Sequence, residues 1–169
     1  FDTMTAVAHY DGVMKTLIHK FKYARQKFLF RILNDIVITQ KKLKEIVPAI
    51  DVIVPVPLYW FKKMYRGFNQ SELLSLGIQR YFSKPISANN LCRIKNTESQ
   101  THLSKSQRQV NIHNAFLVKC PRSFQGKKIL LVDDVLTTGV TASECSKKLK
   151  ESGARHVHLL VLANAEYNS

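Results

Sequence analysis

The residues best able to do chemistry in this 169-residue chain lie together in segment 129–141, which reads ILLVDDVLTTGVT. Its four apolar residues predict a buried strand that would deliver Asp133 and Asp134 to the carboxyl edge of a parallel sheet, where open α/β folds bind ligands. The turn that follows leads into a helix, so backbone N–H groups, hydroxyls and the helix dipole would converge on one small volume. The segment predicts a phosphate-sized anion site.

The two carboxylates indicate what lies beside the phosphate. They would repel a phosphate itself, but they suit neighbouring hydroxyl groups or a Mg²⁺ ion shared with the ligand. Gly139 would let the backbone approach the ligand without a Cβ in the way. An acidic pair after a strand, or Thr-Thr-Gly before a helix, is ordinary when taken singly. The ordered set favours a sugar-phosphate site.

Three short, β-branched and apolar segments predict the buried strands that must position this site, at 51–56, 129–132 and 157–162. Apolar residues at helical spacing predict helices at 13–21, 29–37, 69–82 and 141–149. Buried strands separated by helices indicate a parallel sheet covered on both faces.

Two capping patterns predict helix starts, because Asn69 is followed three residues later by Glu72 and Thr141 by Glu144. Segment 93–114 is polar, and its isolated apolar residues follow neither helical nor strand spacing. It predicts a long mobile loop, which in a compact domain is usually functional.

The strongly positive net charge of the chain indicates an anionic partner. The chain carries 26 Lys+Arg against 12 Asp+Glu, a net charge of +14, and segment 15–44 holds nine of the cations with Asp35 as its single acid. Phe21, Tyr23, Phe28 and Phe30 interleave with these cations, a combination typical of single-stranded nucleic-acid surfaces. The candidate nucleic-acid-binding residues are Lys15, Lys20, Lys22, Arg25, Lys27, Arg31, Lys62 and Lys63. Two alternatives stay open: core aromatics beside solvated lysines, or contact with an anionic membrane surface.

Length and composition exclude several classes. One domain spanning residues 1–169 is expected, with a basic helical part at 1–48 and a ligand-binding core at 49–169. No apolar run is long enough for a membrane-spanning helix. The three cysteines are odd in number and widely spaced, which excludes a disulfide framework and favours a reducing compartment. The chain opens on Phe1, which indicates a trimmed piece of a longer protein.

Segment 129–141 closely resembles the phosphoribosyl-pyrophosphate (PRPP) signature of type I phosphoribosyltransferases. PVPL at 55–58 followed by RGFNQ at 66–70 narrows the resemblance to ComF-type competence proteins, which are phosphoribosyltransferase-like proteins associated with bacterial DNA uptake. The downstream loop resembles the spaced pattern of the same family at eight positions: Arg93, Thr97, Gln100, Leu103, Arg108, Asn111, Ala115 and Phe116. The resemblance runs from Tyr10 to Ala163.

This resemblance implies a type I phosphoribosyltransferase-like α/β fold: a parallel sheet flanked by helices, a flexible lid loop within 93–108 and a small N-terminal helical or hood region. Family members commonly carry a Cys-rich zinc finger before the first helix. This chain has none, so no zinc is expected in it: either the finger was removed with the start of the protein, or this version lacks it.

The resemblance also implies roles for individual residues. Asp133 and Asp134 would bind the ribose hydroxyls and act as catalytic residues, and Mg²⁺ would arrive with PRPP, without direct protein ligands. The 5′-phosphate would be held by Thr137, Thr138, Gly139, Val140 and Thr141, next to Val135 and Leu136. The pyrophosphate would lie near Val56, Pro57 and Leu58 and be held by Arg66, Arg93 and Arg108.

The leading hypothesis is a cytoplasmic competence protein that binds PRPP and handles incoming single-stranded DNA during natural transformation. A DNA-translocating helicase of the uptake machinery is a further candidate partner, and the inner face of the membrane a candidate location. The alternative is a metabolic phosphoribosyltransferase acting on an unidentified acceptor, through an oxocarbenium-like transition state that the aspartates would stabilise. A sensor that binds PRPP without turnover is a third possibility. No residue can be assigned to a base.

Overall fold

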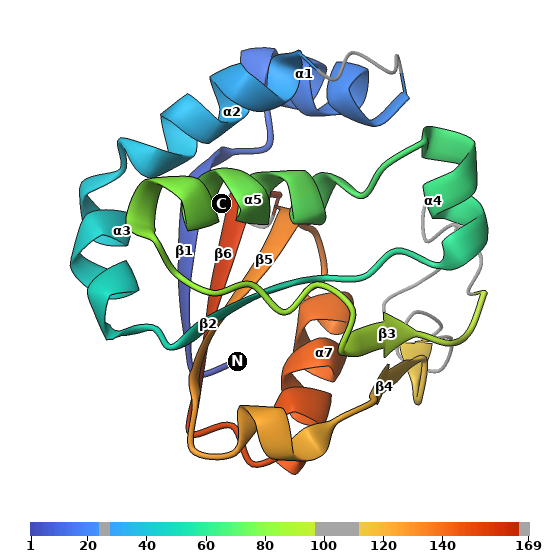
Figure 1. Cartoon of the computed structure of the whole chain (residues 1–169). Helices are drawn as coiled ribbons and strands as arrows, with labels where there is room; N and C mark the ends of the chain where they lie inside the picture. The colour runs from blue at the N-terminus through green and yellow to red at the C-terminus, as the bar shows by residue number, and fades with distance from the viewer. Residues whose placement is uncertain (24–27, 97–111, 166–169) are drawn as a thin grey trace.

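The fold is built on a four-stranded parallel sheet (Figure 1). The computed structural model describes residues 1–23, 28–96 and 112–165. The strands are β1 (Thr3–His9), β2 (Val52–Pro55), β5 (Lys128–Leu136) and β6 (His156–Asn164), in the order β1-β6-β5-β2. The three strands predicted from the sequence are confirmed. β5 runs four residues further than predicted, so Asp133 and Asp134 belong to the strand itself.

The first strand, β1, was not predicted, because residues 1–48 were expected to be helical. It pairs in parallel with β6, with Thr3 opposite His158. Exposed Thr3 and buried Thr5 hid this strand, because both are polar and break the apolar pattern that predicts a buried strand. In the structure Thr5 Oγ1 lies 2.9 Å from His158 Nε2 and Thr3 Oγ1 lies 2.7 Å from His158 Nδ1. The N-terminal part therefore supplies an edge strand of the central sheet as well as helices.

Helices cover both faces of this sheet. On one face lie α1 (Gly12–Tyr23), α2 (Leu29–Ile38) and α5 (Gln70–Phe82), which pack on alternate residues of β5 such as Leu130 and Val132. On the other lies α7 (Val140–Glu151), which packs on Ile129 and Leu131. This alternation is the expected pattern for a strand buried on both faces. The other helical elements in the described parts of the chain are α3 (Lys41–Ile46), α4 (Trp60–Arg66) and two 3-10 turns at Val47–Ala49 and Pro121–Phe124.

A separate antiparallel pair, β3 (Leu91–Arg93) and β4 (Phe116–Val118), lies beside α7. The polar loop expected between these strands lies mostly at 97–111, outside the described residues. The lid stays a prediction.

The two expected helix caps behave differently. Asn69 caps α5 as predicted, because its Oδ1 accepts a hydrogen bond from Ser71 N–H at 3.1 Å. The prediction for Thr141 is wrong: α7 begins at Val140, and Gly139 occupies the N-cap position. Glu144 instead accepts a hydrogen bond from the backbone N–H of Asn114 at 3.0 Å, which ties α7 to the segment before β4.

The close contact between α2 and α5 depends on Gly77, which has no side chain. A Cβ at position 77 would clash with the side chain of Asn34, which is only 5% exposed. Gly77 therefore sets how closely the two helices approach.

We expect Gly77→Ala to lower the free energy of unfolding by about 1 kcal/mol. Alanine favours the helix by about 1 kcal/mol over glycine, but overpacking of a tight contact costs about 1–3 kcal/mol. Urea denaturation measures the change. The double variant Gly77→Ala/Asn34→Ala should recover most of the loss, and a Gly77→Ala protein more stable than the parent would contradict the packing argument.

Candidate functional site

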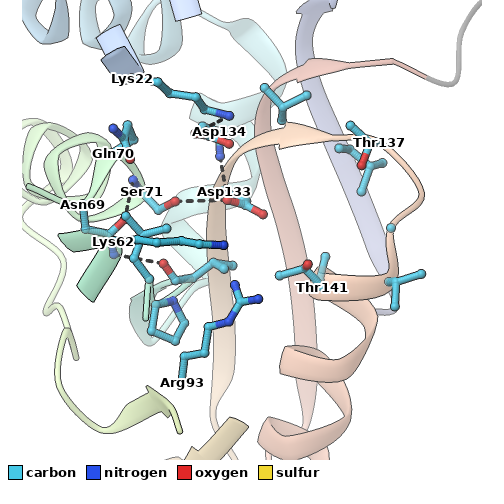
Figure 2. A pocket seen from close by; sticks show the side chains of 18 of the residues that line it. Lys22, Lys62, Asn69, Gln70, Ser71, Arg93, Asp133, Asp134, Thr137 and Thr141 are labelled. Atoms are coloured by element: carbon cyan, nitrogen blue, oxygen red, sulfur yellow. Dashed lines mark hydrogen bonds and ion pairs between the residues drawn. The ribbon is translucent and has the colours of Figure 1, made fainter. Parts of the chain in front are cut away.

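A pocket of about 500 Å³ opens at the carboxyl end of β5 (Figure 2). Several elements around that edge contribute to its lining. The lining residues are Tyr10, His19 and Lys22 from the N-terminal part, residues 56–58 after β2, Lys62 and Arg66 of α4, residues 69–71 at the start of α5, Arg93 of β3, and residues 133–142. The structure thus brings together all the candidate ligand-binding residues except Arg108, which lies outside the described residues.

The turn at 137–139, which the sequence predicts to hold a phosphate, contains a glycine in a conformation that favours glycine. Gly139 has φ +69°, in the left-handed region that favours glycine, and stands immediately before α7. The first turn of α7 and residues 137–139 therefore border the pocket at the positive end of a twelve-residue helix. Unbonded N–H groups at such a terminus, together with the dipole, favour an anion.

Asp133 is held from two sides. Its Oδ1 accepts a hydrogen bond from Ser71 Oγ at 3.1 Å and another from the backbone N–H of Asp134 at 2.9 Å. Burial, and next the negative charge of Asp134, raise the pKa of Asp133 to about 7. A carboxyl group in this state gains its charge near neutral pH, in a position where a hydroxyl or a cation would stabilise the charged form.

Asp134 forms an ion pair with Lys22, whose Nζ lies 2.9 Å from Asp134 Oδ2. Burial opposes the charged form of Lys22, but the carboxylates of Asp134 and Asp133 outweigh it, so the pKa of Lys22 is raised. Lys22 is also one of the candidate nucleic-acid-binding residues of α1. In the structure its side chain is 19% exposed and lies inside the pocket.

Three cations face these carboxylates across the pocket. Burial lowers the pKa of Lys62, and repulsion by Arg93 and Arg66 lowers it further. Figure 2 shows Lys62 and Arg93 pointing into the same space, opposite Thr141. An anion between them would relieve this repulsion. The pocket therefore combines a cationic side, a phosphate-sized turn and an acidic pair, which suits a ligand that carries both phosphates and hydroxyls.

The other candidate nucleic-acid residues lie elsewhere. Lys15, Lys20 and Arg31 are exposed on α1 and α2, while Arg25 and Lys27 fall outside the described residues. Lys63 forms an ion pair with Glu72 at 2.7 Å. Among the interleaved aromatics, Phe21 is fully buried and packs on Phe68, so it is a core residue, whereas Phe28 is 62% exposed.

Sequence reasoning missed several lining residues, chiefly Ser71, Tyr10 and His19. Asn69 was predicted as a helix cap and Gln70 only as part of the RGFNQ motif, and neither was predicted to line the site. Asn69 Nδ2 donates to the carbonyl of Val56 at 3.0 Å, which fixes the start of α5 against the turn after β2. The capping pattern and the RGFNQ motif were the available signals, since both place the start of α5 at this edge.

Within residues 1–23, 28–96 and 112–165, no group of three or more His, Cys, Asp or Glu side chains gathers in a way that could hold a metal ion. None of the helices described is both long and apolar enough to cross a membrane.

The raised pKa of Asp133 predicts a pH-dependent cost to stability. Its pKa is near 4 in the unfolded chain and about 7 in the fold, so the native state binds the proton more tightly and loses stability as pH rises from about 4 to 7. We expect Asp133→Asn to raise the Tm by several degrees at pH 8, where each kcal/mol corresponds to about 2–4 °C, and to leave it unchanged near pH 4. Thermal unfolding monitored by circular dichroism measures this. Equal shifts at both pH values would contradict the assignment.

Comparison with known proteins gives the family. The model of the phosphoribosyl transferase domain matches residues 40–167. Competence protein F of Haemophilus influenzae is 35% identical over 169 residues, covering 98% of this chain and 74% of the relative. DNA utilization protein YhgH of Escherichia coli K12 is 32% identical, covering 94% of this chain and 70% of the relative.

A crystal structure of adenine phosphoribosyltransferase, 16% identical, superposes with a TM-score of 0.50 over 83% of this chain and 74% of that one. At this identity the likeness concerns the fold alone, and it agrees with the parallel sheet and flanking helices described above. The chain belongs to the ComF family and has a type I phosphoribosyltransferase-like α/β fold.

Proposed function

We propose that this chain binds PRPP together with Mg²⁺ in the pocket at the end of β5, and that it handles incoming single-stranded DNA during natural transformation. In this proposal it works in the cytoplasm beside the DNA-translocating machinery. The names of two relatives, a competence protein and a DNA utilization protein, support a role in handling DNA during natural transformation. One observation supports PRPP as the ligand: the acidic pair Asp133 and Asp134 and a cationic cluster face each other across one pocket, beside the turn at Gly139.

Each part of PRPP has a matching part of the pocket. Asp133 and Asp134 suit the ribose hydroxyls, because a carboxylate accepts charge-assisted hydrogen bonds from them. The turn at 137–141 suits the 5′-phosphate, and Lys62, Arg66 and Arg93 suit the pyrophosphate. Lys22 already pairs with Asp134, so it would keep the acidic side from repelling the ligand as a whole.

The pocket also fits a ligand that arrives with Mg²⁺. The ion would be held by oxygens of PRPP and by water, without a direct protein ligand, and the nearby carboxylates would favour its positive charge. Mg²⁺ would neutralise charge on the pyrophosphate when bound. The acidic pair stands where positive charge would develop on the ribose, and the cationic cluster where pyrophosphate would depart. The same arrangement would therefore support transfer to an acceptor as well as binding.

The ligand assignment predicts a large loss of affinity in Asp133→Asn/Asp134→Asn. Each carboxylate hydrogen bond contributes about 1.5–3 kcal/mol, so we expect PRPP affinity in the presence of Mg²⁺ to fall at least about a hundredfold. Isothermal titration calorimetry measures this. Asp35→Asn, an exposed carboxyl group on α2, is the matched control and should bind as the parent does. Unchanged affinity in the double variant would refute the site, and no binding by the parent would refute the ligand.

The DNA assignment predicts binding that weakens steeply with salt. We expect Lys15→Gln/Lys20→Gln/Arg31→Gln to weaken binding of a labelled oligothymidylate and to lower the slope of log affinity against log salt by about 2, since each phosphate contact contributes about 0.7. Fluorescence anisotropy measures both.

Lys119→Gln/Lys127→Gln/Lys147→Gln is the control for this variant. It removes the same charge from exposed positions away from the pocket and should change the slope little. Absence of binding by the parent near physiological salt would overturn the DNA half of the proposal, and equal effects of the two triple variants would overturn its location on α1 and α2.

A further inference from the structure

Helix α4 has the reverse of the usual amphipathic arrangement. Its large apolar side chains are exposed: Trp60 by 59%, Phe61 by 56%, and Met64 and Tyr65 by 70% each. At 100° per residue these four positions share one continuous face of the helix. Lys62 and Arg66 fall on the opposite face and line the pocket. A helix on the surface of a globular protein normally buries its apolar face and exposes its charges.

The exposed face is mainly a surface of rings. The ring centroids of Trp60 and Phe61 are 5.8 Å apart in an edge-on arrangement, and Tyr59 extends the set with its centroid 5.7 Å from Trp60. Contiguous exposed apolar patches of this kind mark binding surfaces on soluble proteins. No residue of α4 is buried, so these side chains contribute little to the core of the fold.

Charge indicates which partner fits. The sequence contains no acidic residue between Asp51 and Glu72, and the exposed cations of α1 and α2 include Lys15, Lys20 and Arg31. Rings for bases and cations for the backbone are the combination by which single strands are bound without sequence preference. A second copy of the chain is a poor fit, because two surfaces of a +14 protein would repel each other.

We propose that the exposed face of α4 is a stacking platform for the bases of single-stranded nucleic acid, at the rim of the PRPP pocket. This inference rests on the proposed DNA function and deepens it by assigning the base contacts to Trp60, Phe61 and Tyr65. The exposed cations of α1 and α2 would hold the backbone, since α1 and α4 both border the same pocket. A strand bound in this way crosses the mouth of the pocket.

The chain offers a direct test, because Trp60 is its only tryptophan. Titration with oligothymidylate should quench the emission of Trp60 in parallel with the rise in anisotropy of a labelled strand. Heparin, a polyanion without bases, should compete for binding and leave the emission nearly unchanged. Quenching by heparin as strong as that by the oligonucleotide would overturn base stacking.

The variant Trp60→Ala/Tyr65→Ala should bind oligothymidylate at least about tenfold more weakly with an unchanged salt slope, since stacking and not phosphate contact is lost. PRPP binding and thermal unfolding should stay as in the parent, because neither side chain lines the pocket. Tyr81→Ala, which removes an exposed ring of α5 outside the pocket lining and the candidate DNA-binding residues, is the matched control and should bind DNA as the parent does.

The remaining outcomes separate the two proposals. DNA binding by the parent with equal affinity in the double variant would overturn the platform and leave the DNA function standing. No DNA binding by the parent would overturn the DNA function itself. A dimer in sedimentation that dissociates on Trp60→Ala/Tyr65→Ala would assign the face to a second copy, and binding to anionic vesicles with none to DNA would assign it to a membrane; either result would overturn the inference.

Discussion

Two adjacent carboxylates at the end of a buried strand are the constraint on which the rest of the site depends. Asp133 and Asp134 repel each other, and burial removes much of the water that would otherwise screen them. The fold compensates with fixed partners: the hydroxyl of Ser71, the backbone N–H of Asp134 and the ammonium group of Lys22. These partners come from α5, β5 and α1. The acidic pair therefore ties helices distant in the sequence to one strand.

The compensation is incomplete in a way that suits binding. Asp133 retains a pKa of about 7, so it is only partly ionised at neutral pH without a ligand. On the other side of the pocket Lys62, Arg66 and Arg93 repel one another. A ligand with hydroxyls at one end and phosphates at the other would stabilise the charged form of Asp133 and also reduce the repulsion among the cations. Sites of this kind are held at a cost in stability that the surrounding core must supply.

Local chemistry explains what the sequence could predict. Apolar runs identified three of the four strands of the central sheet, because both faces of those strands are buried. The motif 129–141 identified the turn and the acidic pair, because each residue type in it has a local role. The strand β1 escaped because Thr3 and Thr5 pair with His158, a partner more than 150 positions away. The contact of Lys22 with Asp134 escaped for the same reason, since only the folded chain brings α1 to Asp134.

The division between the two kinds of basic residue is likewise a product of the fold. Lys22, Lys62 and Arg66 are spread over 45 positions of the sequence, yet the structure gathers them around one pocket and leaves Lys15, Lys20 and Arg31 exposed. Because Lys62 and Arg66 turn inward, the opposite face of α4 is left to its aromatic side chains. The exposed rings are thus a geometric consequence of building the cationic side of the pocket from a short helix. This couples the location of the small ligand to that of the surface proposed for the polymer.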